Sequence, residues 1–263
     1  MLKIQTNSKV LIMLKIASVF VGDVFKSNQG CLVEVVHYEN SKNVWVQYQD
    51  SFGYIAKCYA TDLRLGKFKN PYYTSVEGIG YLGVGSFRCW SNGSMSKAYI
   101  TWRHMIIRGY NKKYKTKYPT YKDCTVDKEW HNFQVFAKWY TRHEFYGLGY
   151  ELDKDILVRG NKVYSANTCS LVPKQVNYLL LDKYNFRGDY PVGITKNKLG
   201  GNFAVKVSLY GKNNYLGSFT DLKEACGVYK KAKESYVKEV ALFWQGRIED
   251  KVFEKLMKWT VVF

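Results

Sequence analysis

Residues 191–245 read PVGITKNKLGGNFAVKVSLYGKNNYLGSFTDLKEACGVYKKAKESYVKEVALFWQ, and they carry the clearest local pattern in the chain. Three runs, PVGIT, NFAVKVSLY and NYLGSF, are separated by KNKLGG and GKN, which is typical of antiparallel strands joined by turns. The run that follows places apolar residues at helical spacing and predicts one long amphipathic helix. The expected unit is a three-stranded sheet with one helix.

The expected helix has recognisable ends and a recognisable buried side. Asp221, with Glu224 three residues later, predicts a capping box, and Gly246 predicts the stop. The residues expected in the buried stripe are Leu222, Ala225, Tyr229, Ala232, Tyr236, Val240 and Phe243. Most of the lysines fall outside it.

The middle strand is expected to have two unlike faces. Phe203, Val205, Val207 and Leu209 alternate with Asn202, Lys206, Ser208 and Tyr210. The helix can cover the apolar face, which leaves a polar and basic face free. Such a face either contacts a nucleic-acid groove or is simply solvated, and from the residues alone both readings stay open.

The charge of the whole chain favours a polyanion as partner. Its 263 residues carry 40 Lys and Arg against 22 Asp and Glu, a formal charge of +18. Lysines interleaved with Tyr, Asn, Ser and Gly in predicted strands suit phosphate contacts better than a lipid surface. The length favours two or three small domains, each with its own core, over one large core.

Short alternating runs between residues 20 and 71 predict a small antiparallel β-barrel or curled sheet. Leu32, Val44 and Val46 are expected inside it, with Glu34, Lys42, Gln47 and Gln49 outside. A glycine-rich connector follows at 74–95. Its Gly78, Gly80 and Gly83 match GxGxxG, but no helix pattern comes next, so a dinucleotide site is not expected.

The central segment is expected to be helical around a basic loop. KAYITWRHMIIRGYN predicts a short helix that ends at Gly109, and NKKYKTKYPTYKD predicts a loop. The aromatic stripe expected in the next core is Trp130, Phe133, Phe136, Ala137 and Tyr140. His131 and His143 fall off this stripe, so each is expected either at phosphate or in solvent.

Six cysteines stand singly, without a CxxC pair, and indicate reduced thiols in a cytosolic protein. A zinc site from Cys124 and Cys169 with His131 or His143 is the alternative, and buried thiols are favoured. The first 20 residues lack the cleavage pattern of a signal peptide, and Lys15 interrupts their apolar run. Neither secretion nor membrane spanning is therefore expected. Met13 is an alternative start. The expected compartment is the cytoplasm.

The VGITKNKLGGNFAVKV, YLGSF and DLKEACGVYKKA segments together resemble the APETALA2-type DNA-binding domain. In that family the sheet contacts the major groove of double-stranded DNA. The resemblance therefore implies a DNA-binding role for Thr195, Lys196, Asn197, Lys206, Ser208, Asn213 and Tyr215. Several of these positions are Arg or Trp in the plant members.

The middle of the chain resembles phage-type HNH homing endonucleases, through KAYITWRHMIIRGYN, YPTYKDCTVDKEWHNFQVFAKWY and ELDKDILVRGNKVYSANTCSLVPKQVN. That family places a His base and a metal-binding Asp on a ββα unit. Asp153 stands at the acidic position, but Lys154 stands where the His is usual. Thr168 occupies a second position that is commonly Asn, with Asn167 beside it.

Two readings of this unit follow from the resemblance. In the first, Asp153 and Asp155 hold Mg²⁺ or another divalent metal, and Lys154 or His131 acts as the base. In the second, the scaffold binds DNA and cuts nothing. Turn or capping roles for the two aspartates, a hairpin turn at Asn161 and a core position for Cys169 are the plain structural alternatives.

The sequence therefore predicts a multi-domain α+β protein of phage type. The expected parts are an N-terminal β-barrel-like domain at 1–75, a Gly-rich linker at 76–95, an HNH-like domain at 96–182 and an APETALA2-like domain at 186–263. Metal-dependent cleavage or nicking of double-stranded DNA is the leading function. Non-catalytic DNA binding is the alternative, and a phage factor that binds a host protein complex is the third. If the chain is phage-encoded, the host cytoplasm is its expected compartment.

Overall fold

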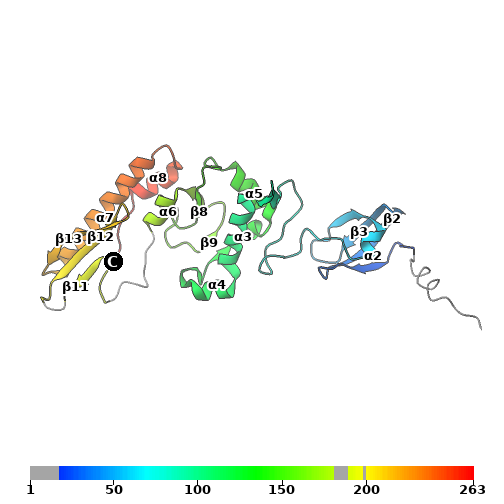
Figure 1. The fold of residues 1–263 in the computed structure, drawn as a ribbon, viewed down its shortest axis with the longest axis horizontal. Helices are drawn as coiled ribbons and strands as arrows, with labels where there is room; N and C mark the ends of the chain where they lie inside the picture. The colour runs from blue at the N-terminus through cyan, green and yellow to red at the C-terminus, as the bar shows by residue number, and fades with distance from the viewer. Residues whose placement is uncertain (1–17, 181–188, 198–199) are drawn as a thin grey trace, which may run out of the picture. The chain divides into compact units, whose positions relative to one another are not determined.

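The computed structural model describes residues 18–180, 189–197 and 200–263, so the choice between Met1 and Met13 as the start lies outside the described residues. The fold is mixed α+β, with seven α-helices and several small sheets in this part of the chain (Figure 1). The chain divides into two compact units, Met1–Gly85 and Ser86–Phe263. None of the described helices combines the length and apolar character that a membrane crossing requires.

The first unit is built on a four-stranded antiparallel sheet. Its strands β1 (Val24–Lys26), β2 (Leu32–Asn40), β3 (Asn43–Tyr48) and β4 (Ile55–Cys58) lie in sequence order. The short helix α2 (Ala60–Arg64) follows, and its Leu63 is buried with the strands. The antiparallel meander is confirmed, but the described strands form an open sheet rather than a closed barrel.

One side of β2 differs from the expectation. Leu32 was expected inside but is 44 % exposed, whereas Val33 and Val35 are fully buried against Val44 and Val46. The register explains the difference, since Val33 lies opposite Tyr48 and Val35 lies opposite Val46. Because side chains alternate along a strand, these pairs put Leu32 on the outer face.

The second unit begins with the small hairpin of β5 (Trp90–Ser91) and β6 (Ser94–Met95), followed by two packed helices, α3 (Lys97–Tyr110) and α5 (Phe133–Arg142). Ser96 caps α3 by accepting the Tyr99 N–H. The expected aromatic stripe is confirmed: Trp130, Phe133, Phe136, Ala137 and Tyr140 are all buried. Trp130, in the 3₁₀ turn η2 (Lys128–His131), accepts the Trp102 indole N–H at 2.8 Å.

The basic segment expected to be a loop is in fact largely helical. It forms α4 (Lys112–Lys117) and the 3₁₀ turn η1 (Pro119–Tyr121). Asn111 ends α3 and caps α4 at once, since its side chain accepts the Tyr114 N–H. The prediction was wrong because lysines carry no apolar periodicity, and here an Asn cap starts the helix.

The 151–169 stretch connects two short antiparallel strands, β8 (Glu151–Asp153) and β10 (Ser170–Val172), in which Asp153 lies opposite Ser170. Inside the connection, β9 (Val163–Tyr164) pairs in parallel with β7 (Thr125–Val126). The helix α6 (Lys174–Leu179) follows β10. Three strands, β8, β9 and β10, therefore precede α6 in the chain, and the ββα unit implied by the resemblance stays a prediction.

The three strands and the long helix expected at the C-terminus are confirmed. Strands β11 (Ile194–Lys196), β12 (Phe203–Leu209) and β13 (Lys212–Phe219) form an antiparallel sheet, and α7 (Leu222–Trp244) packs on it (Figure 1). Asp221 caps α7 by accepting the N–H groups of Lys223 and Glu224, and Gly246 follows its end with φ +70°. A further helix, α8 (Asp250–Met257), follows α7.

One residue of the expected polar face is wrong. Tyr210 lies against α7, where its hydroxyl donates to Glu239 and its ring centre is 4.7 Å from that of Tyr236, because φ +51° ends the strand alternation there.

The buried stripe of α7 drifts around the helix, so one expected member is wrong. Phe243 is 59 % exposed and contacts the Arg247 guanidinium, whereas Val237 and Ala241 are fully buried. The first half of α7 faces the sheet, but the second half shares a core with α6 and α8. Successive residues of a helix are rotated by about 100°. Because α6 and α8 contact a different side of α7 from the sheet, a different set of residues is buried in the second half of the helix.

Candidate functional site

The sheet β11–β13 presents one polar and basic face. Cross-strand partners share a face, so Thr195 opposite Ala204, Lys206 opposite Tyr215 and Ser208 opposite Asn213 form successive rows on it. The side chains of this face are exposed except for Ala204, and Tyr215 is 61 % exposed. Five of the seven residues nominated for DNA contact therefore lie together.

The other two nominated residues lie apart from these rows. Lys196 is opposite Phe203, and its ammonium lies 5.7 Å from the centre of that ring, on the side of the strand away from Thr195. Asn197 is exposed in the turn after β11, where its N–H donates to the Asn202 carbonyl at 2.8 Å. Both are at the rim of the sheet.

The opposite face of the sheet holds its position by packing. Val205 and Val207 are buried against Ala225 and Tyr229 of α7. Gly193 lets the chain enter β11 beneath α7, since a Cβ there would lie 2.2 Å from the Tyr229 ring. Its carbonyl accepts the Lys206 N–H at 2.7 Å, where a register shift interrupts the ladder. The polar rows are thus carried by a fixed layer.

In the 151–169 loop, Asp153 works as a turn-forming carboxylate. Its Oδ1 accepts the N–H groups of Asp155 at 2.8 Å and Ile156 at 2.7 Å. Burial raises the pKa of Asp153, although these two N–H donors act in the opposite direction. The turn role that the sequence left open as an alternative is the arrangement found for Asp153.

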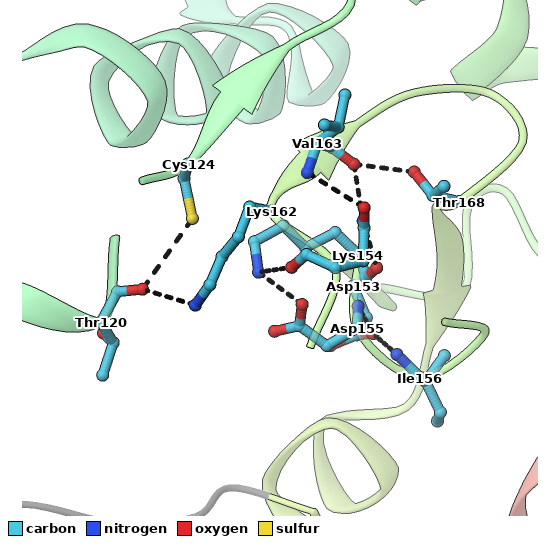
Figure 2. A network of polar contacts seen from close by, with 10 residues as sticks. Thr120, Cys124, Asp153, Lys154, Asp155, Ile156, Lys162, Val163 and Thr168 are labelled. Carbon is cyan, nitrogen blue, oxygen red and sulfur yellow. Dashed lines mark hydrogen bonds and ion pairs between the residues drawn. The ribbon is translucent and has the colours of Figure 1, made fainter. Parts of the chain in front are cut away.

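Lys154 lies inside the loop instead of in solvent, with 5 % of the residue exposed. Its Nζ contacts Asp155 Oδ1 at 2.5 Å and donates to the Asn161 carbonyl at 3.0 Å (Figure 2). The Tyr164 ring centre lies 5.7 Å away. A buried ammonium needs such partners, because desolvation without compensation is costly.

Asn161 and Thr168 complete the loop. The Asn161 side chain donates to the carbonyls of Lys154 and Val163, and its oxygen accepts the Val163 N–H at 3.1 Å. The Thr168 hydroxyl donates to the same Val163 carbonyl at 2.7 Å (Figure 2). Thr168, at a position that is commonly Asn in the family that this segment resembles, therefore hydrogen-bonds the backbone of the loop.

A divalent ion on Asp153 and Asp155 is what the resemblance implies, and Mg²⁺ favours octahedral oxygen ligation. Here one Asp153 oxygen already accepts two N–H bonds, and the Lys154 ammonium at Asp155 would repel a divalent ion. Within the described residues, no three His, Cys, Asp or Glu side chains gather as metal ligands. The arrangement fits an internal ammonium better than a divalent ion, and metal binding stays a prediction.

His131 and His143, expected at phosphate or in solvent, both make internal contacts. His131 Nε2 lies 2.9 Å from the Tyr110 hydroxyl and 3.1 Å from the Val126 carbonyl. Burial lowers the pKa of His131. A neutral imidazole can act as a general base. Here, however, the Nε2 atom of His131 is directed towards Tyr110 and the Val126 carbonyl of β7. Its role as the base stays a prediction.

A buried polar cluster that no spacing in the sequence indicates joins three distant segments. His143 Nε2 lies 3.2 Å from Glu249 Oε2, and the Ser170 hydroxyl donates to the same oxygen. Lys251 Nζ contacts Glu249 Oε1 at 2.9 Å. The carboxylate lies between the serine and the histidine, so the His does not activate the Ser hydroxyl, and the cluster is a structural clasp.

Arg108 is a second internal group that sequence reasoning missed. It hydrogen-bonds Tyr164 and Tyr114, and its guanidinium lies 5.6 Å from the Tyr121 ring centre. Burial raises the pKa of Tyr164, which keeps its hydroxyl neutral as a hydrogen-bond partner of Arg108.

The cysteines agree with the prediction of buried, reduced thiols. Cys124 and Cys169 are both fully buried, and all six cysteines are free.

Comparison with known proteins gives no further guide, since no family model, curated protein or solved structure matches the chain.

Proposed function

We propose that this chain is a double-stranded DNA-binding protein that holds DNA through the polar face of β11–β13 and does not cleave it. The observation that carries the proposal is that exposed polar residues lie together on one face of the packed sheet. They are Thr195, the cross-strand pair of Lys206 and Tyr215, and the cross-strand pair of Ser208 and Asn213. The major groove is wide enough to admit β-strands, whose side chains then reach phosphates and base edges. The face offers a cation, hydroxyls, an amide and an aromatic ring for such contacts.

The distribution of charge supports this assignment. Residues 18–85 carry six Lys and Arg and six Asp and Glu, so the described part of the first unit has no net charge. Residues 86–263 carry 31 Lys and Arg against 16 Asp and Glu, a net charge of +15. A polyanion is therefore attracted to the second unit, which contains the sheet.

The environment of Lys154 favours binding over cleavage. Its ammonium is committed to Asp155 and the Asn161 carbonyl, and a Lys acts as a base only when it is neutral. The phage-type pairing of an HNH-like unit with an APETALA2-like unit, in the host cytoplasm, belongs to the same proposal. Metal-dependent cleavage stays a prediction that the same experiment decides.

The test measures binding and cleavage on the same preparation of the full chain. Fluorescence anisotropy with a duplex at several salt concentrations should show binding that weakens steeply as salt rises. Supercoiled plasmid incubated with Mg²⁺ or Mn²⁺ should stay intact. Metal-dependent nicking that is lost in Asp153→Ala would overturn the non-cleaving proposal, and no binding at low salt would overturn DNA binding.

Lys206→Glu tests whether the sheet face makes the contact. Affinity should fall at least about tenfold, because a phosphate attraction becomes a repulsion. Lys231→Glu on the exposed side of α7 makes the same charge change away from the sheet and is the matched control. Equal affinities for the two variants would remove the sheet from the interface.

A further inference from the structure

The most one-sided charge in the chain lies outside the sheet. Residues 78–122 contain nine Lys and Arg and no Asp or Glu. They supply more than half of the net +15 carried by residues 86–263. The α3–α4 segment is therefore the strongest source of positive potential in the second unit.

On α4, the exposed side chains share one side of the helix. Lys112, Lys113, Thr116 and Lys117 are exposed, whereas Tyr114 and Lys115 are half-buried. At about 100° per residue, the four exposed side chains fall within an arc of about 140°. Lys122 continues the charge beyond η1. We call Lys112, Lys113, Lys117 and Lys122 the α4 lysines.

The α4 lysines stand on a fixed support. The Tyr114 ring packs between Tyr118 and Tyr121, with ring centres 4.6 and 5.7 Å away. Lys115 points inward and donates to the Cys124 carbonyl at 2.9 Å. Lys162, from the 151–169 loop, reaches the Thr120 carbonyl at 3.5 Å. The helix is therefore held in place rather than free to swing its charges apart.

The charges of this surface are not neutralised inside the protein. Among the residues that the structure describes, none of the α4 lysines forms an ion pair. Lys113 and Lys117 are separated by four positions, where like charges on a helix repel. A bound polyanion would relieve this repulsion.

We propose that the α4 lysines are a second DNA contact, which grips the phosphate backbone of a duplex outside the stretch covered by the sheet. This inference rests on the proposed function and adds a separate, sequence-independent anchor to it. Lysine ammonium groups act as point charges on phosphates and read no bases. The exposed Tyr118 hydroxyl can donate to the same backbone. Release of counterions from the DNA supplies the affinity.

The test is the triple variant Lys112→Gln, Lys113→Gln and Lys117→Gln, measured in the full chain. Glutamine is polar and has nearly the helix propensity of lysine, and the substitution removes the charge. A plot of log affinity against log salt should become shallower by about 2 to 3, because each lost phosphate contact removes about 0.9. The loss should be the same for duplexes of different sequence.

The matched control is the triple variant Lys223→Gln, Lys231→Gln and Lys238→Gln on α7, which removes the same charge from three exposed lysines. Its slope should stay close to that of the unmodified chain. If both triple variants give the same slope, α4 is not a contact, while DNA binding itself still stands. If the unmodified chain does not bind duplex DNA, the proposed function fails and α4 loses its partner with it.

Discussion

Glu249→Gln is expected to lower the free energy of unfolding by about 2 kcal/mol at pH 7. Glutamine has the shape of the protonated carboxyl group, so the substitution removes the charge and keeps one acceptor oxygen. Burial by itself raises the pKa of Glu249, but the hydrogen bonds from His143, Ser170 and Lys251 outweigh it and bring the value to about 2. The clasp therefore stabilises the ionised form.

The magnitude follows from that pKa. A fall from an ordinary 4.5 to about 2, at about 1.4 kcal/mol per tenfold change in proton affinity, corresponds to about 3 kcal/mol. The Glu249 side chain is 19 % exposed, so part of this is screened by water, and about 2 kcal/mol remains.

The pH dependence follows from the sign of the shift. Because the folded pKa is lowered, the stabilisation is complete above the ordinary value of 4.5 and is lost as pH falls towards about 2. Urea unfolding followed by tryptophan fluorescence at pH 7 and at successively lower pH measures it. The difference between the two proteins should shrink as pH falls through this range.

Glu254→Gln is the control for the clasp, since it removes the same charge from α8, the helix that Glu249 directly precedes. Glu254 pairs with Lys258 at 3.6 Å on the surface, with a side chain that is 66 % exposed. Its loss should cost less than about 1 kcal/mol. A Glu249→Gln effect that is equally small, or one that persists unchanged at low pH, would refute the reasoning about the clasp.

Two further substitutions test the loop and the sheet. Lys154→Met keeps the side-chain stem but leaves the Asn161 carbonyl without its donor, so we expect a loss of about 1 to 3 kcal/mol by urea unfolding. EDTA should not change the unfolding midpoint of the unmodified protein, and a marked fall would point to a bound metal. Gly193→Ala brings a Cβ to within 2.2 Å of Tyr229 at φ +80° and should cost about 2 to 4 kcal/mol. Gly211→Ala, at φ +75° with open space around it, should cost only about 1 kcal/mol, and equal effects of the two would contradict the packing argument.

The C-terminal sheet and helix could be predicted because their signals are local. Alternation places Val205 and Val207 on one face and Lys206 and Ser208 on the other within a single strand. The Asp221 cap also acts within three residues of its own position. The misplaced residues depend on partners elsewhere: Leu32 on the register with β3, and Phe243 on α6 and α8.

The interior of the candidate site could not be predicted in the same way. His143 and Glu249 are 106 positions apart, and neither stands in a recognisable motif. Lys154 stands between Asp153 and Asp155 in the sequence, and this pattern is found for solvated and for buried lysines alike. Arg108 looks like a surface charge of α3 until the loop brings Tyr164 to it. Such contacts depend on tertiary packing and not on spacing.

The 151–169 loop and α4 are joined by these unpredicted contacts, and this gives the loop a role that needs no cleavage chemistry. The Lys154 ammonium lies at the Tyr164 ring, and Tyr164 in turn holds Arg108, which also contacts Tyr114 and Tyr121. Lys162 adds a bond to the Thr120 carbonyl. The stretch that resembles a nuclease site therefore braces the helix that carries the α4 lysines. Lys154 holds the loop together through its contacts with the Asp155 carboxylate and the Asn161 carbonyl. The contacts of Lys154 and the support of α4 then have one physical explanation: the internal ammonium holds together the loop that packs against the helix carrying the α4 lysines.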